Sequence, residues 1–241
     1  MIGWRTRIGF LVPPGNPTVE PEMTELAPQG VSVHFTRLSA SGPAGTHAGQ
    51  EERNRSQIAS LDEATRLLAM VSPQVIVLAH TATSYTLGRD AEAELVRRQE
   101  TASGTRFVTA FGSVLAALNA LNVRRIAYAT PYAADLTEQG RAHLTQHGFD
   151  VVAVARLEGV RSIYDETAER AYAVGKQADR PDAEAVFLSG TGMPTLAMLQ
   201  VLEDDLGKPV ISAASAMMWN ALRVAGVRAP RQGYGRLLLR T

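Results

Sequence analysis

The chain has 241 residues, a formal net charge of zero and no cysteine, with 45% hydrophobic and 20% charged residues. A neutral charge balance leaves no basic surface for nucleic acid or an anionic membrane, and no apolar run approaches the ~18–20 residues of a membrane-spanning helix. The absence of cysteine excludes disulfides, thiolate metal sites and a thiol nucleophile. The length suits one large domain or two lobes of about 100–120 residues. The opening MIGWRTRIGFLVPP lacks the apolar core and cleavage site of a signal peptide, so we expect a cytoplasmic protein.

Short apolar runs alternate with helical stretches along the whole chain. We expect strands at residues 7–13, 31–39, 74–80, 106–110, 124–130, 150–157, 184–190 and 209–213. We expect helices at residues 51–70, 89–103, 111–121, 133–147, 162–178, 194–206 and 215–225. Several of the strands are continuous Val/Ile/Leu/Ala runs, which is typical of parallel strands buried on both faces. The sequence therefore predicts an α/β protein built from βαβ units. The polar, Gly-rich segment 41–50 is expected to be a surface connection, with a mobile lid as the alternative.

The first strand ends in a stiff turn, FLVPPGNPTVEPE at residues 10–22. The Pro-Pro pair fixes the backbone, and Asn16 follows with an amide that can donate to a carboxylate. Asn16 can equally be an Asn-Pro turn initiator with no ligand.

Two other strand ends form a weak internal repeat. TATS (81–84) and SGTG (189–192) each follow an apolar strand and each combine hydroxyl-bearing and very small residues. Ligands of open α/β sheets bind beyond the carboxyl ends of the strands, so two similar lobes would place these turns across one cleft. The alternative is chance, because Ser and Thr cap helices very often.

These turns have the composition of an anion-binding site. Backbone N–H groups at a helix N-terminus favour an anion, the small residues Ala82, Gly190 and Gly192 leave room for a ligand, and hydroxyl groups add donors. Such turns can hold a carboxylate or a developing enediolate by oxyanion-hole logic, without a metal.

Tyr132 and His80 are the candidate proton carriers. Tyr132 follows a strand in YATPYAADL, and we expect it to be too exposed for core packing, so that its phenol can donate a proton. A half-buried surface tyrosine is the alternative. His80 lies two residues before Ala82, so the two side chains can point the same way. His80 can be an acid or base, or simply a satisfied histidine at a strand end.

No metal or nucleotide motif stands out. His143 and His147 are four residues apart on an expected helix, but no third ligand is evident, so we expect a solvated helix face and no metal site. No GxGxxG follows a strand and no GxxxxGK[ST] occurs, so no nucleotide cofactor is expected.

Taken in order, these fragments resemble the aspartate/glutamate racemase superfamily, and most closely its branch with maleate cis-trans isomerase and arylmalonate decarboxylase. The resemblance rests on IGFLVPPGNPTVEPE, on VTAFGSVLAALNALNVRRIAYATPY and on LGKPVISAASAMMWNALRVAG. It implies two pseudo-symmetric, Rossmann-like α/β lobes with parallel sheets and an active-site cleft between them. The first lobe would comprise residues 1–112 plus 217–241 and the second residues 113–216.

The resemblance also implies cofactor-free chemistry on a small carboxylate, carried in most of the branch by cysteines. The two family cysteines would fall at Ala82 and Gly190, so this sequence lacks both. The residues that match the family's binding apparatus remain, with Asn16 for a substrate carboxylate and Pro14 lining the pocket. Thr83, Ser84 and Tyr132 would stabilise an anion, and Gly190 and Thr191 would offer backbone N–H groups.

The predicted function is an enzyme with decarboxylase-type lyase chemistry, which holds an enediolate-like anion and takes its proton from Tyr132, His80 or water. One alternative is a non-catalytic protein that binds small carboxylates. Another is a hydrolase or hydratase that uses water in the space of the missing cysteines. A homo-oligomer stays open, since the sequence indicates no interface.

Overall fold

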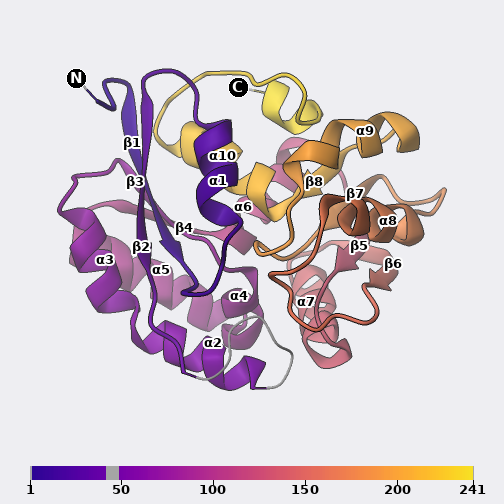
Figure 1. Ribbon diagram of the computed structural model, residues 1–241, viewed down its shortest axis with the longest axis horizontal. Coiled ribbons are helices and arrows are strands. Elements are labelled where there is room, and N and C mark those ends of the chain that lie inside the picture. Colours follow the sequence, from indigo (N-terminus) through magenta and orange to yellow (C-terminus); the bar gives the residue numbers. More distant parts are fainter. Residues whose placement is uncertain (1, 42–48, 241) are drawn as a thin grey trace.

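The computed structural model describes residues 2–41 and 49–240, which form two four-stranded parallel sheets flanked by helices (Figure 1). The first sheet has the order β2-β1-β3-β4 and the second the order β6-β5-β7-β8. The two orders are the same when each strand of the first sheet is matched with the strand four later, so the α/β prediction with two similar parallel sheets is confirmed. The strands are β1 (Thr6–Val12), β2 (Val31–Arg37), β3 (Val75–Leu78), β4 (Arg106–Thr109), β5 (Arg125–Thr130), β6 (Asp150–Arg156), β7 (Ala185–Leu188) and β8 (Val210–Ser212).

The continuous apolar runs explain the central position of β3 and β7. Every residue of VIVL in β3 and of AVFL in β7 is buried, and each strand pairs with a neighbour on both sides. Burial on both faces leaves no place for polar side chains within these strands, so the polar residues begin where the strands end. That arrangement places the hydroxyl-rich segments at the carboxyl ends.

Ten α-helices and a short 3₁₀ helix cover the sheets of the described chain. They are α1 (Val19–Leu26), α2 (Gln50–Ala59), α3 (Leu61–Ala69), α4 (Thr81–Leu87), α5 (Arg89–Ser103), α6 (Ala110–Ala120), α7 (Ala134–Gln146), α8 (Ala168–Ala178), α9 (Leu196–Leu206), α10 (Ala213–Val224) and η1 (Arg236–Leu239).

Four helices differ from the sequence prediction. The expected helix at 51–70 is two helices that meet at Ser60, whose hydroxyl donates to the Gln57 carbonyl. Helix α8 starts only at Ala168, because Thr167 caps it by accepting from the Arg170 amide. Helices α1 and α4 were not expected from the sequence. Pro21 lies in the first turn of α1, where a missing N–H is tolerated.

Helices α6 and α10 pack against each other between the two sheets (Figure 1). Each contacts strands of both sheets, and every residue of α10 from Ala213 to Leu222 is buried. The C-terminal segment also reaches both sides, because Tyr234 donates to Glu25 in α1 and Arg236 pairs with Glu203 in α9. The division of the chain at 112/113 and 216/217 therefore stays a prediction.

Two further expectations concern the segment 41–50 and membrane-spanning helices. Residues 42–48 of the predicted connection or lid lie outside the described residues. Among the described residues, no helix is long and apolar enough to cross a membrane.

Candidate active site

The carboxyl ends of the two sheets are joined by buried hydrogen bonds. Thr191 Oγ1, just after β7, donates to the carbonyl of Ala79, just after β3, at 2.9 Å. Asn16 Nδ2, after β1, donates to Thr191 Oγ1 at 3.3 Å, and Thr18 Oγ1 donates to the Gly192 carbonyl at 2.9 Å. The structure thus brings together Asn16, the end of β3 that leads into α4 (Thr81–Leu87), and the turn at 189–192.

Asn16 is held in place by its own side chain. Its Oδ1 accepts from the backbone amides of Thr18 and Val19, which fixes the turn that enters α1. The guanidinium of Arg37 donates to the carbonyls of Pro14 and Asn16 and supports the same loop. The predicted substrate-binding Pro14 is exposed, whereas Asn16 is only 1% exposed. The loop is thus rigid, and the Asn16 amide group faces the second sheet.

Tyr132 is buried, and the expectation that it is exposed or half-buried is wrong. It is 1% exposed, and its hydroxyl pairs with Thr81 Oγ1 at 3.0 Å. Burial raises the pKa of the Tyr132 phenol, so the hydroxyl keeps its proton at neutral pH. A second tyrosine, which sequence reasoning missed, repeats the contact, because Tyr85 pairs with Ser189 Oγ at 2.9 Å. The hydroxyl groups of both tyrosines therefore form hydrogen bonds between the strand ends of the two sheets.

His80 and Thr83 form a local pair at the start of α4. The His80 Nδ1 lies 2.8 Å from Thr83 Oγ1, and both side chains are buried. Burial, helped by the positive charge of Arg53, lowers the pKa of His80 to about 4. His80 is thus a neutral imidazole at pH 7 and not a standing imidazolium acid.

Arg53 is a site residue that the sequence did not reveal. It lies on α2, is 4% exposed, and its charge lowers the pKa of His80. Its charge also acts on Tyr164, whose pKa burial raises to about 12. A buried guanidinium at this place provides positive potential for a carboxylate. Helix α2 is polar from Gln50 to Gln57, so no local pattern distinguishes Arg53 from its exposed neighbours.

Ser84 has a partner that changes its predicted role. Its Oγ donates to Oε1 of Glu92 at 2.6 Å, and Ser84 is fully buried. The hydroxyl has one hydrogen, so in this arrangement Ser84 offers a lone pair and not a donor to any ligand. Ala82 beside it is also fully buried.

The glycines of the second turn are dictated by space. Gly190 has φ of 96°, and a Cβ there would lie 2.9 Å from Pro131 Cγ. A Cβ at Gly192 would lie 2.7 Å from Tyr164 Cδ1. A cysteine at position 190 would thus need a strained backbone and a shift of Pro131.

His143 and His147 correct a second expectation. His143 is 3% exposed, so the predicted solvated helix face is wrong at this residue. Its Nε2 lies 3.2 Å from Oε2 of Glu92. Glu92 is thus a third potential ligand beside the two histidines, and the sequence did not indicate it. Glu92 lies on α5, far along the chain from α7, so only folding brings the three together.

Glu22 is a second buried carboxylate that the sequence did not indicate as functional. Its Oε1 accepts from the backbone amides of Thr195 and Leu196 at the start of α9, at 2.6 and 3.0 Å. Its Oε2 is buried without a hydrogen-bond partner in the described chain. Burial raises the pKa of Glu22 to about 7. A carboxyl group with such a pKa near two strand-end turns is a candidate for acid–base chemistry.

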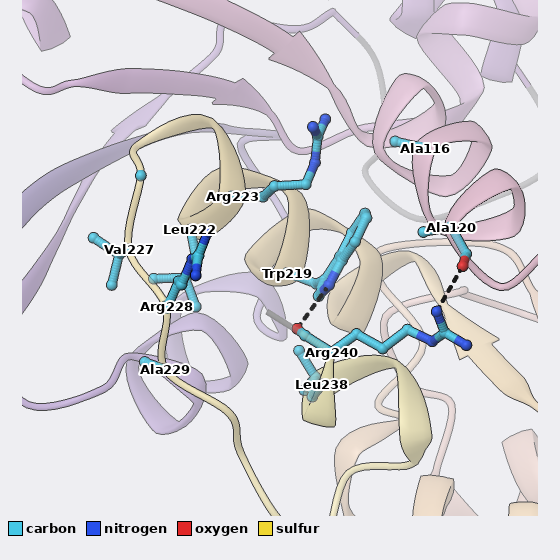
Figure 2. Close-up of a pocket in the computed structure, with 11 residues that line it drawn as sticks. Ala116, Ala120, Trp219, Leu222, Arg223, Val227, Arg228, Ala229, Leu238 and Arg240 are labelled. Carbon is cyan, nitrogen blue, oxygen red and sulfur yellow. Dashed lines mark hydrogen bonds between the residues drawn. The ribbon is translucent and has the colours of Figure 1, made fainter.

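Two cavities of the described chain lie at separate places. A small cavity of about 40 Å³ is lined by Tyr132 and by residues of α2 and α7, including Asn54 and Gln139. A larger pocket of about 630 Å³ lies between α6, α10 and the C-terminal segment (Figure 2). None of the predicted site residues lines this larger pocket.

Two of the three arginines that line the larger pocket, Arg223 and Arg240, have structural partners. Figure 2 shows Arg240 donating to the carbonyl of Ala120 at the end of α6, while Trp219 Nε1 donates to the Arg240 carbonyl. Arg223 lies in the last turn of α10 and covers the Trp219 ring. Positive groups stabilise helix C-termini, so these contacts account for the charge of Arg223 and Arg240. We place the candidate site at the strand ends, where the buried polar groups converge.

Comparisons with known proteins point to one family. The family model for arylmalonate decarboxylase matches residues 8–238. Arylmalonate decarboxylase of Bordetella bronchiseptica is 31% identical over 242 residues, which cover 95% of each chain. Maleate isomerase of Nocardia farcinica is 27% identical over 246 residues, covering 96% of this chain and 95% of that protein.

Solved structures agree on the fold. The maleate isomerase Iso of Pseudomonas putida S16 superposes with a TM-score of 0.89 at 23% identity and covers 98% of both chains. A crystal structure of arylmalonate decarboxylase gives a TM-score of 0.82 at 27% identity, with 98% of this chain and 100% of that chain covered. The predicted resemblance is confirmed, and the chain belongs to the arylmalonate decarboxylase family.

Proposed function

We propose that this protein is a cofactor-free enzyme that acts on a small carboxylic acid by decarboxylase-type lyase chemistry, without a catalytic cysteine. The observation that carries the proposal is the buried cluster of Asn16, Tyr132 and Thr83 where the two sheets meet, in a chain of the arylmalonate decarboxylase family. In such a reaction the bond to the leaving carboxylate breaks, CO₂ departs, and the electron pair remains as an enediolate. A proton then adds to carbon.

The charges around the cluster suit a decarboxylation followed by protonation. The amide of Asn16 and the positive potential of Arg53 favour a carboxylate. The neutral hydroxyl of Tyr132 donates a hydrogen bond to the developing oxyanion, where a buried donor contributes most. Tyr132 or a water molecule supplies the final proton, because the pKa of His80 is too low for a charged acid at pH 7.

A covalent route through cysteine is not open to this chain. A structure of the Nocardia farcinica maleate isomerase contains a succinylcysteine intermediate. This chain has no cysteine, so it cannot form that adduct.

A non-catalytic carboxylate-binding protein is the second candidate. It is favoured by the mutual hydrogen bonds of Thr81 with Tyr132 and of His80 with Thr83, which leave no charged acid in the cluster. Such a protein would bind small acids tightly and release no product. Turnover separates the two candidates.

The test uses Tyr132→Phe, which deletes one hydroxyl and little volume. Wild type is assayed for CO₂ release from a panel of small malonates and for thermal protection by the same acids, since a ligand of the folded state raises stability. We expect Tyr132→Phe to lose about 10²–10³-fold in turnover, the cost of one oxyanion donor.

The matched control is Tyr172→Phe, which removes a phenol that bonds Asp205 on the outside of the second sheet. It should leave turnover unchanged. Strong protection with no turnover in wild type would favour the binding protein. Equal turnover in Tyr132→Phe and wild type would show that the site is misplaced.

A further inference from the structure

Two helices from different parts of the chain bring three metal-type ligands together. Helix α5 supplies Glu92, and α7 supplies His143 and the residue at its C-terminal end, His147. The two histidines are four residues apart and so share one face of the helix. One potential ligand atom from each of the three residues lies within 4.8 Å of the others.

The carboxylate is already oriented by its surroundings. Oε1 of Glu92 accepts from Ser84 Oγ at 2.6 Å and from Thr109 Oγ1 at 2.5 Å. Oε2 points instead toward His143. Outer hydrogen bonds of this kind fix the orientation of a ligating carboxylate and are part of how metal sites are built.

His147 supplies an independent observation. Its Nε2 is buried and has no hydrogen-bond partner among the described residues. Its ring instead contacts the rings of His143, at 5.0 Å between centroids, and of Phe111. A buried nitrogen without a partner costs free energy, which a bound ion would remove.

We propose that Glu92, His143 and His147 form a binding site for one divalent transition-metal ion of the zinc type. Two imidazoles and one carboxylate are an established zinc ligand set, with a water molecule in the fourth position. Bonds of about 2.1 Å place tetrahedral ligand atoms about 3.4 Å apart. His143 Nε2 and Glu92 Oε2 are already 3.2 Å apart, so only the separations to His147 need to close, by at most about 1.4 Å. His147 caps the end of α7, where a small backbone adjustment is easiest.

A neighbouring pocket and two nearby charges bear on ion binding. An open pocket is lined by Gly88, Asp90 and Gln146, which are close in sequence to Glu92 and His147. The positive charge of Arg89 lies near His147 and acts against binding, whereas the Glu92 carboxylate acts for it.

The ion would join the two halves of the molecule. Helix α5 packs on β4 of the first sheet and α7 on β6 of the second. An ion held by both would stabilise their contact, which the His143–Glu92 hydrogen bond now makes. This role does not depend on the proposed function.

The experiment titrates the untagged protein with Zn²⁺ by calorimetry at pH 7.5 and with Co²⁺ by visible absorption. We expect one saturable site per chain, Co²⁺ bands of a four-coordinate site with nitrogen and oxygen ligands, and a rise in Tm with Zn²⁺. Because the chain has no cysteine, no thiolate competes for the ion.

The decisive variant is His147→Gln, which removes a ligand that makes no hydrogen bond and so leaves the apo protein folded. It should weaken Zn²⁺ binding at least about tenfold. The matched control His34→Gln alters a histidine on β2 that pairs with Ser32, and should bind as wild type does. Absence of a saturable site in wild type, equal affinity in His147→Gln, or equal loss in His34→Gln would each overturn the proposal.

Discussion

Glu22 and Glu92 are each 7% exposed, and each connects an element beside the first sheet with one beside the second. Burial raises the pKa of Glu22 to about 7, and two backbone amides offset only part of that effect. Burial also acts upward on the pKa of Glu92, but hydrogen bonds from His143, Ser84 and Thr109 outweigh it and leave the pKa lowered. Hydrogen bonds outweigh the effect of burial at Glu92, whereas they offset only part of it at Glu22, and this difference separates the two pKa values.

The comparison is tested most strongly by Glu92→Ala. The change leaves His143 and two buried hydroxyls without their acceptor, so we expect a loss of about 3–5 kcal/mol in the free energy of unfolding. Urea unfolding at pH 7 measures it. The control Glu94→Ala, on the same helix, breaks only an exposed ion pair with Arg97 and should cost less than about 1 kcal/mol. Equal costs for the two variants would show that Glu92 is not an organising group.

The pH dependence of stability that Glu22 causes should be opposite in sign to that of Glu92, and Glu22→Gln tests it. A carboxyl group whose folded pKa is raised contributes its stability below the unfolded pKa of 4.5 and loses it as pH rises through about 7. The glutamine variant does not titrate, so it should gain on wild type across this window by at most about 3.5 kcal/mol, at about 1.4 kcal/mol per pKa unit.

The measurement for Glu22→Gln is a series of urea unfolding curves from pH 4 to pH 8 on both proteins. The stability difference between them at pH 4 is the reference, because both side chains are uncharged there. A difference that stays constant over the series would mean that Glu22 titrates normally.

Thr109→Val is the smallest of these changes and sharpens the account of Glu92. It removes one hydroxyl donor from Glu92 and the acceptor that caps α6 at Gly112, so we expect a cost of about 1–3 kcal/mol. A lowered carboxyl pKa contributes stability above the unfolded pKa and loses it as pH falls. Without the Thr109 donor, the folded pKa of Glu92 lies nearer to the unfolded value, so less of this stability is present and its loss is complete at a higher pH.

Thr109→Ser keeps the hydroxyl and serves as the matched variant for acid unfolding followed by circular dichroism. It should retain most of the stability that valine loses. If serine and valine behave alike, the methyl group and not the hydrogen bond is what matters at this position.

Local patterns predicted the strands well and the helices less well. Runs such as VIVL in β3 are apolar without alternation, and only a strand covered on both faces accommodates them. Helices α1 and α4 escaped prediction for different reasons. Pro21 lies in the first turn of α1, and a proline there makes the segment look non-helical in the sequence. The segment TATSYTL of α4 has a composition that suits a turn as well as a helix.

The sequence likewise indicated some residues of the candidate site and not others. The polar strand ends at 81–84 and 189–192 were evident from the residues that follow two apolar strands, although 81–84 starts helix α4 rather than forming a turn. Arg53, Glu22 and Glu92 were not, because each lies in a helix among other charged residues that remain exposed. Nothing in the local sequence distinguishes a charged side chain that folding will bury from one that it will not.

The sequence by itself determined the α/β class, the parallel strands and the polar strand ends, because these depend on the periodicity of apolar residues over short windows. The tertiary structure alone decided which polar groups meet. Tyr132 pairs with Thr81, and Glu92 pairs with His143, across 51 residues of chain in each case. Such pairings, and the pKa shifts that follow from them, arise only when two sheets bury the same polar groups against each other, since charge and desolvation act through space and not along the chain.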